Sequence, residues 1–169
     1  MSVVQDGQGF IWLATRNGLN RYDGHAFRIY KNIPGQAGSL ANNYVNTLFC
    51  DSRHRLWIGT NGGLDRYDAV NDSFVHVNLN ITSGKPVNAI AEDRSGRIWI
   101  GTPYGLDWIG AAGGVAPPRL TGMDVRTVFE DSQGTIWIGT ADGIKRLIPR
   151  HGGWRVTTIT HTSAAGSLS

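Results

Sequence analysis

The sequence has few residues that favour helices and only one cysteine. Two glutamates and three lysines stand against 23 glycines in 169 residues, a balance typical of turn-rich β structure. The single cysteine, Cys50, excludes a disulfide framework and a cysteine-rich metal site. No apolar run approaches the roughly 18 residues that a bilayer-spanning helix needs, and residues 1–10 lack the pattern of a secretion signal. We therefore expect an all-β domain.

Positive charge is present but is not concentrated anywhere. The net charge is +3, and the thirteen arginines are spread along the chain without a run of five or more like charges. Because a surface that follows a nucleic-acid backbone clusters its cations, we expect no nucleic-acid binding. The five histidines show no H-x-x-x-H spacing, and there is neither a G-x-S-x-G motif nor a phosphate-binding loop. The sequence thus predicts no catalytic residue, no metal site and no cofactor, and hence a protein that is not an enzyme.

One segment occurs four times along the chain. The tryptophans of the four copies are separated by 45, 42 and 38 residues. Each Trp follows an Asp by six residues and precedes a Thr by three and a Gly by six. A period near forty residues with four columns in phase indicates a structural repeat. The columns are Asp6, Asp51, Asp93 and Asp131; Trp12, Trp57, Trp99 and Trp137; Thr15, Thr60, Thr102 and Thr140; and Gly18, Gly63, Gly105 and Gly143.

Each repeat has the pattern of four short strands. In the second copy, the β-rich segments 45–51, 55–60, 64–68 and 73–79 are separated by turn sequences. Four antiparallel strands in about forty residues, repeated in register, indicate a blade of a β-propeller. A β-sandwich, the leading alternative, does not require each strand to recur. We expect about four four-stranded antiparallel blades, at residues 1–43, 44–86, 87–124 and 125–161.

Two copies depart from the common pattern. The turn after each repeated Asp combines a carboxylate that can accept backbone hydrogen bonds with a Gly that supplies a positive φ. In the second copy His54 stands where the others have Gly9, Gly96 and Gly134, so we expect this turn to be strained or built differently. In the third copy residues 111–120 replace the fourth strand, so we expect a degenerate outer edge.

The column pattern V-x-x-I-x-x-D-x-x-G-x-I-W-I-G-T-x-x-G-L-x-R-Y resembles the two-component regulator propeller repeat. In the third copy it is carried by Val87, Ile90, Asp93, Gly96, Ile98, Trp99, Ile100, Gly101, Thr102, Gly105 and Leu106. The resemblance covers nearly the whole chain. It implies a sensory propeller from the periplasmic part of a membrane-bound hybrid histidine kinase or diguanylate-cyclase protein. It also implies a ligand, a carbohydrate fragment or another small molecule.

The four blades are expected to be part of a larger ring. The letters AGSL at residues 37–40 lead into the innermost strand of the second copy and recur at 165–168, so we expect 162–169 to be a linker toward a further blade. A closed ring needs a neighbour for every blade. We weigh a partial propeller of about seven blades, four blades that close on themselves, two chains joined head to tail in an eight-bladed ring, and an unstable fragment. Any membrane attachment would lie outside this chain.

Residues that are the same in every copy are expected to serve the blade, which assigns a structural role to the repeated Trp, Asp and Thr. The same holds for Glu92 and Glu130, which occupy equivalent phases. Function is expected where the copies differ, in the loops between second and third strands and at the blade starts, which share one face of a propeller. The residues of these loops either form a polar pocket with an aromatic wall, to which residues 42–46 and Asn88 also contribute, or are only solvated turn residues. The candidate ligand-binding residues are Arg16, Asn17, Tyr44, Asn61, Tyr104, Arg126 and Asp142.

The sequence is compatible with three functions. The first is a non-catalytic sensory propeller that binds a ligand or a partner. The second is a metal-dependent enzyme, because G-x-I-W-I-G-T also resembles the tryptophan repeats of streptogramin lyase. Such an enzyme needs histidine and glutamate at its channel mouth, and the variable loops contain no histidine. The third, a structural scaffold for protein interaction, is not distinguished from the first by the sequence.

Overall fold

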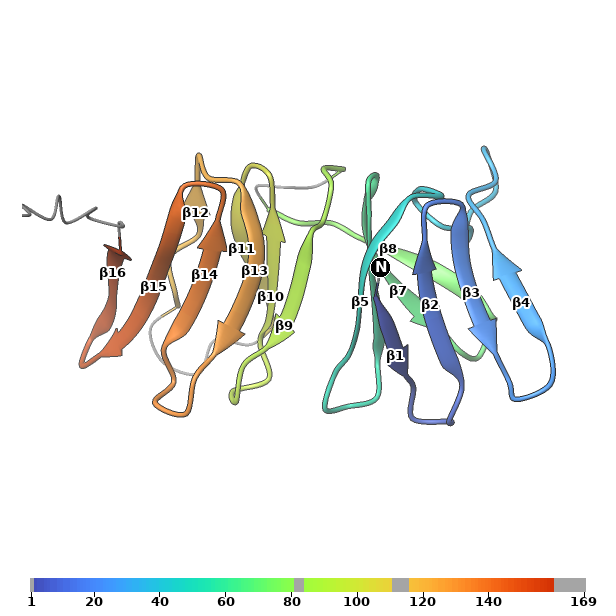
Figure 1. Cartoon of the computed structure of the whole chain (residues 1–169), viewed down its shortest axis with the longest axis horizontal. Helices are drawn as coiled ribbons and strands as arrows, with labels where there is room; N and C mark the ends of the chain where they lie inside the picture. The colour runs from blue at the N-terminus through green and yellow to red at the C-terminus, as the bar shows by residue number, and fades with distance from the viewer. Residues whose placement is uncertain (1, 81–83, 111–115, 160–169) are drawn as a thin grey trace, which may run out of the picture.

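The chain folds into four antiparallel sheets, as the computed structural model shows for residues 2–80, 84–110 and 116–159 (Figure 1). Each sheet contains four strands that pair in chain order, which is the topology of a propeller blade. The predicted all-β fold with four four-stranded blades is therefore confirmed. Within the described ranges, no helix has the length and apolar character that a bilayer crossing requires.

Blades 1 and 2 connect their second and third strands by tight turns. Thr15 lies opposite Gly18 and Thr60 opposite Gly63, so two residues form each turn. The strands of blade 1 are β1 (Val3–Gln5), β2 (Ile11–Thr15), β3 (Gly18–Tyr22) and β4 (Phe27–Tyr30); those of blade 2 are β5 (Val45–Cys50), β6 (Leu56–Thr60), β7 (Gly63–Asp68) and β8 (Ser73–Val77).

Blades 3 and 4 differ in their outer strands. β12 has only two residues, which confirms the degenerate outer edge predicted for the third copy. The β15–β16 hairpin is longer, and its ladder ends where Arg150 lies opposite Gly153. The strands of blade 3 are β9 (Ala89–Glu92), β10 (Ile98–Thr102), β11 (Gly105–Ile109) and β12 (Leu120–Thr121); those of blade 4 are β13 (Val125–Glu130), β14 (Ile136–Thr140), β15 (Gly143–Arg150) and β16 (Gly153–Ile159).

The first strand of each blade lies at the inner edge of the array. β1 lies against β5, β5 against β9 and β9 against β13, while β4 and β16 lie at the two far ends of the molecule (Figure 1). We name the end of the blades with the turns 15–18, 60–63, 102–105 and 140–143 the Thr-Gly end. The opposite end, with the turns that follow the repeated aspartates, is the Asp end.

The repeated tryptophans hold neighbouring blades together. Trp12, Trp57 and Trp99 are at most 3% exposed and belong to the cores of the blade 1–2, 2–3 and 3–4 junctions, respectively. Each indole N–H donates to the carboxylate six residues earlier, at 2.7 to 2.9 Å. A buried indole with a satisfied N–H contributes its apolar area without the cost of an unmet hydrogen bond. The expected structural role is confirmed for these three Trp-Asp pairs, and Trp137 donates to Asp131 at 2.7 Å in the fourth copy.

The Asp turn has one design in all four copies. Asp51 Oδ1 accepts the backbone N–H groups of Arg53 and Arg55 at 3.0 and 2.9 Å, and the same pair of bonds recurs in the other turns. Gly96, in the fourth turn position, has a φ of 78°, and His54 takes the same left-handed region with a φ of 58°. The second turn is therefore strained as expected, but it is not built differently.

Glu92 and Glu130 join neighbouring blades at the Asp end. Glu92 on blade 3 accepts hydrogen bonds from the backbone N–H and the hydroxyl of Ser52 on blade 2, both at 2.7 Å. Glu130 on blade 4 accepts the N–H of Arg94 on blade 3 at 2.8 Å and pairs with its guanidinium at 3.2 Å. These bonds cross the blade junctions, which confirms the structural role expected for both glutamates.

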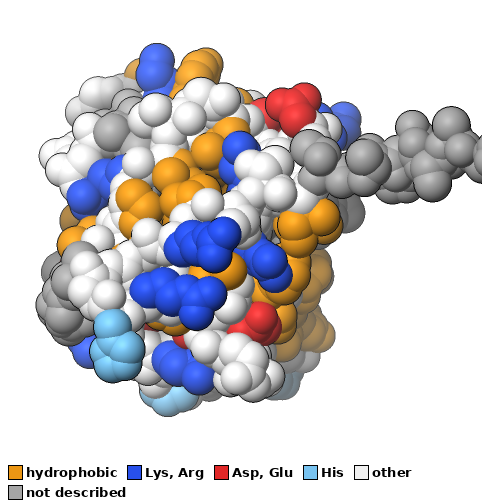
Figure 2. Space-filling model, turned by 90° about the vertical axis from the view of Figure 1, so that its left-hand side faces the viewer, with side chains coloured by type: hydrophobic (Ala, Val, Ile, Leu, Met, Phe, Trp, Pro, Cys, Tyr) orange, Lys and Arg blue, Asp and Glu red, His pale blue; other side chains and the backbone are white. Residues whose placement is uncertain are grey.

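The two end blades each expose an apolar flank. Val3 on blade 1 is 60% exposed and Phe129 on blade 4 is 63% exposed. Leu48 and Phe49, which hold the same phases in blade 2, pack against the two cores on either side of it. The four blades thus form an open arc and do not close on themselves. Figure 2 shows the β15–β16 side of this arc, where hydrophobic side chains lie at the surface beside lysines and arginines. The predicted linker at 162–169 lies outside the described residues.

Candidate functional site

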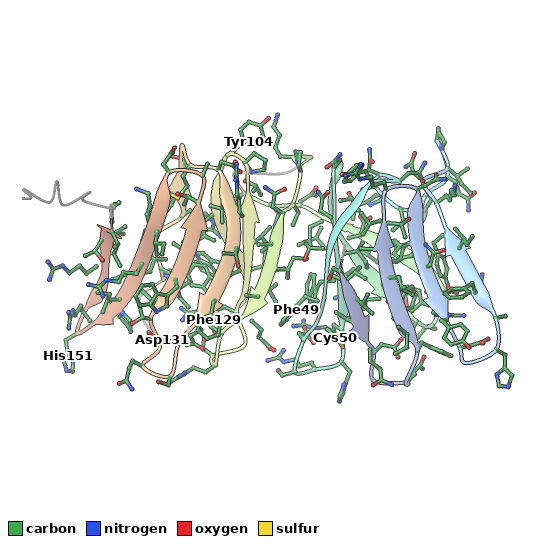
Figure 3. The ribbon with its side chains drawn as sticks, viewed as in Figure 1. Phe49, Cys50, Tyr104, Phe129, Asp131 and His151 are labelled. Atoms are coloured by element: carbon green, nitrogen blue, oxygen red, sulfur yellow. The ribbon has the colours of Figure 1, made fainter. Side chains whose placement is uncertain are left out.

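All seven candidate residues lie at the Thr-Gly end of the blades. Arg16 and Asn17 form the turn between β2 and β3, and Tyr44 directly precedes β5. Figure 3 shows Tyr104 at this end of the molecule and Asp131 at the opposite end. The other candidates are Asn61 in the β6–β7 turn, Arg126 near the start of β13, and Asp142 in the β14–β15 turn.

A cleft of about 570 Å³ opens at this end, lined by the end of β2 in blade 1, the start of β5 in blade 2 and the residue before β9 in blade 3. It brings together two of the predicted residues, Arg16 and Tyr44, with Asn46 of β5 and Asn88 just before β9. The Arg16 guanidinium carbon lies 5.7 Å from the centre of the Tyr44 ring, within the range of a cation–π contact. The cleft therefore offers a cation, an aromatic face and two amides.

The two amides are fixed by hydrogen bonds from one blade to the next. Asn46 donates to the carbonyl of Val87 and to the side-chain oxygen of Asn61, both at 3.0 Å. Asn88 donates to the carbonyl of Val125 at 3.1 Å. These bonds use the amide N–H groups and neither side-chain oxygen of the donors, so both side chains are positioned while each keeps an acceptor.

Asn17 and Asn61 lie next to the cleft and are held by other residues. Asn61 donates its backbone N–H to the carbonyl of Tyr44 at 3.0 Å, which ties the β6–β7 turn to the cleft wall. The ammonium group of Lys31 donates to the side-chain oxygen of Asn17 at 2.7 Å. Lys31 was not predicted from the sequence, because it follows β4 and two strands separate it from the β2–β3 turn along the chain. The fold brings its side chain to this end.

The candidates on blades 3 and 4 do not line the cleft. Tyr104 is 52% exposed, and the ammonium of Lys85 lies 5.3 Å from the centre of its ring. Arg126 pairs with Asp124 at 3.2 Å at the start of β13. Asp142 is exposed in its turn. The predicted residues therefore share one end of the molecule, but only those on blades 1 and 2 lie around a cleft.

The described part of the Thr-Gly end gathers no metal-binding groups. Within the described ranges, no three side chains of histidine, cysteine, aspartate and glutamate come close enough together to hold a metal ion. The side chains that line the cleft offer hydrogen bonding, charge and stacking.

The sheet topology, the inner strands and the Trp-Asp contacts define the chain as an arc of β-propeller blades. The model of the two-component regulator propeller family matches residues 39–62, 82–104 and 119–142. The chain thus carries two-component regulator propeller repeats, as its sequence pattern predicted.

Similar proteins include signalling proteins. A stretch of 41 residues, 24% of this chain, is 44% identical to histidine kinase P4 of Formosa agariphila and covers 3% of that protein. Two structures of the extracellular domain of BT4673 from B. thetaiotaomicron are similar over 94% of the chain, with 26% identity and TM-scores of 0.74 and 0.75. BT4673 is named a one component system in one and a hybrid two component system in the other. The chain spans about a quarter of that domain.

Enzymes with the same fold are more distant. Virginiamycin B lyase from Staphylococcus aureus is 15% identical, with a TM-score of 0.65 over 94% of this chain and 55% of the lyase. A likeness at this identity shows a shared propeller fold and carries no activity with it.

Proposed function

We propose that this chain is a non-catalytic, ligand-sensing propeller segment of a membrane-bound two-component signalling protein. The observation that carries the proposal is the likeness to the extracellular domain of BT4673, which covers 94% of the chain at 26% identity. In this role the blades lie outside the cytoplasm, in the periplasm of a Gram-negative cell. The kinase or another output domain, such as a diguanylate cyclase, belongs to a part of the protein beyond this segment.

The ligand in this proposal is a carbohydrate fragment or a similar polar small molecule at the Thr-Gly end. A sugar ring has an apolar face that stacks on an aromatic side chain, and Tyr44 supplies such a face. Its hydroxyls need donors and acceptors, which Arg16 and the oxygens of Asn46 and Asn88 supply. The inter-blade bonds of both asparagines position these groups before the ligand arrives, which lowers the entropic cost of binding.

Calorimetric titration with a panel of neutral oligosaccharides tests this proposal. Tyr44→Ala removes the aromatic face and should weaken binding about tenfold or more, because stacking and hydrogen-bonding groups at a buried contact contribute roughly 1.5 kcal/mol or more each. Arg155→Gln, an exposed arginine on β16, is the control and should leave binding unchanged. Equal affinity of all three proteins, or turnover of any compound with a divalent metal, contradicts the proposal.

A further inference from the structure

A second cleft lies at the Asp end, between blades 3 and 4. Its volume is about 550 Å³, whereas the clefts at the blade 1–2 and 2–3 junctions of the same end have about 280 and 140 Å³. The blade junctions are otherwise built from the same repeated residues. The cleft at the blade 3–4 junction therefore has about twice the volume of the blade 1–2 cleft and about four times that of the blade 2–3 cleft. The difference arises in blade 4.

The outer hairpin of blade 4 is longer than that of blade 2. The β7–β8 ladder ends where Asp68 lies opposite Ser73, five residues after the turn glycine Gly63. The β15–β16 ladder continues to Arg150, seven residues after Gly143. The two added residues extend the hairpin at the Asp end, where Figure 3 shows His151 at its tip. The cleft is lined by this extension and by the Asp turns of blades 3 and 4.

Trp154 forms an aromatic wall of the cleft that is fixed in place. Its ring centre lies 6.3 Å from that of Trp99, in an edge-to-face arrangement with an interplanar angle of 71°. The Arg97 guanidinium lies 5.2 Å from the ring centre of Trp154 and is itself held by Asp93 at 2.7 Å. The indole is half-buried, so part of its surface faces the cleft. This wall exists without a ligand.

The charge of the cleft is positive. Three arginines and one histidine line it, against a single carboxylate, Glu130. Arg97 is paired with Asp93 and Arg94 with Glu130. Arg150 is exposed and takes part in none of the ion pairs found among the described residues. Its guanidinium is therefore available to an anion, and a guanidinium binds a carboxylate or sulfate with two parallel hydrogen bonds.

The residues that make this cleft different occur in one copy only. Arg94 stands where the other copies have Gly7, Ser52 and Ser132, and the β15–β16 extension has no counterpart in blades 1 and 2. A feature that served the blade would recur in every blade. The coincidence of an extended hairpin, a fixed indole and an unengaged guanidinium at one junction is what a ligand site requires.

We propose that the blade 3–4 cleft binds a small organic anion, a carboxylate or sulfate carried on a ring, with the anion at Arg150 and the ring against Trp154. This site is separate from the cleft at the Thr-Gly end and does not depend on the function proposed for that cleft.

Glucuronate and glucose form a matched pair of probes, since they differ only in the carboxylate. Titrations at low salt, followed by calorimetry and by tryptophan fluorescence, should show binding of glucuronate at least tenfold tighter than that of glucose. Glucose 6-sulfate is the second anionic probe and separates a preference for carboxylate from one for sulfate. Arg150→Gln should weaken binding of the favoured anion about tenfold, the loss of one charged hydrogen-bonding partner. Arg155→Gln removes an equal charge from β16 outside the cleft and should have no effect.

Two further variants locate the bound anion. Trp154→Phe keeps an aromatic wall and should preserve binding while it removes most of the fluorescence change. Arg16→Gln, at the Thr-Gly end, should leave glucuronate binding unchanged. The inference is overturned by equal affinities for glucuronate and glucose with no binding of the sulfate, by equal effects of Arg150→Gln and Arg155→Gln, or by loss of anion binding in Arg16→Gln. None of these results bears on neutral oligosaccharides at Tyr44.

Discussion

Asp93 connects three kinds of contact in a single side chain. Its carboxylate accepts the indole N–H of Trp99 at 2.9 Å, the Nε–H of Arg97 at 2.7 Å and the backbone N–H of Ser95 at 2.9 Å. Burial raises the pKa of Asp93, but hydrogen bonds from Ser95, Arg97 and Trp99 outweigh burial and hold the pKa below its usual value of 3.8. The ionised form is therefore the one that stabilises the fold.

Asp93→Asn should lower the free energy of unfolding at pH 7 by about 1 to 3 kcal/mol, since an amide cannot accept the same set of bonds. Because the folded pKa of Asp93 is depressed, its contribution is present above the unfolded pKa and is lost as pH falls through the folded pKa. The difference in the free energy of unfolding between the two proteins, measured by urea denaturation, should therefore shrink as the pH falls below 3.8. Asp142→Asn, in an exposed turn, is the control. A constant difference between pH 7 and pH 2.5 contradicts the assignment.

The Asp turns keep the same backbone conformation even where one residue type disfavours it. His54 adopts a φ of 58° where the other copies use glycine, and the same two hydrogen bonds to the aspartate are made. A side chain in this region is strained by roughly 1 kcal/mol. The hydrogen bonds and the packing of the blade impose the conformation, so the residue accepts the strain.

Exchange of the turn residues tests this explanation in both directions. His54→Gly should raise the free energy of unfolding by up to about 1 kcal/mol, and Gly96→His should lower it by about the same amount. The space around Gly96 is open, because an added Cβ would approach no heavy atom closer than 3.8 Å, so a loss there reports backbone strain rather than a clash. Thermal unfolding of both variants measures the two changes. A loss of stability in His54→Gly assigns the residue a packing role against Gly7 instead.

The sequence predicted which strands and turns are present more completely than it predicted how long the strands are. The column of Asp, Trp, Thr and Gly indicates strands and turns because each residue makes a local contact, as Trp57 does with Asp51 six residues earlier. The short β12 followed from the glycines and prolines in 111–120. The extension of β15–β16 was not predicted, since Pro149 suggests a turn where the ladder continues to Arg150. That length is set by pairing across the hairpin.

At the scale of the whole molecule, the arc leaves both end flanks without a neighbour. Ile144 on blade 4 is 43% exposed, whereas Leu64 and Leu106 in the same phase of blades 2 and 3 are buried at blade junctions. We propose that isolated chains cover these flanks by pairing head to tail in an eight-bladed ring. Light scattering should then give twice the chain mass of 18.4 kDa. Phe129→Glu places a charge on one flank and should yield single chains; a single-chain mass for the unaltered protein rules out the ring.

The sequence predicted at which end of the molecule the candidate site lies, but not which residues come together in a cleft. Variation among the turns pointed to Arg16 and Tyr44 because their positions in the repeat place them at one end. Which of the variable residues meet depends on contacts between blades, such as the bond from Asn46 to Val87, and a single sequence does not contain these. Tyr104 and Asp142 fit the same sequence pattern, but the contacts between blades do not bring them to the cleft.

The structure of a complex tests the sensory account most directly. A crystal of this chain with the neutral oligosaccharide that gives the strongest calorimetric signal should show the sugar at the Thr-Gly end. The account predicts a ring stacked on Tyr44 and hydroxyls within hydrogen-bonding distance of Arg16 and Asn46. A neutral sugar bound only at the Asp end, or recovered as a cleaved product, would contradict it.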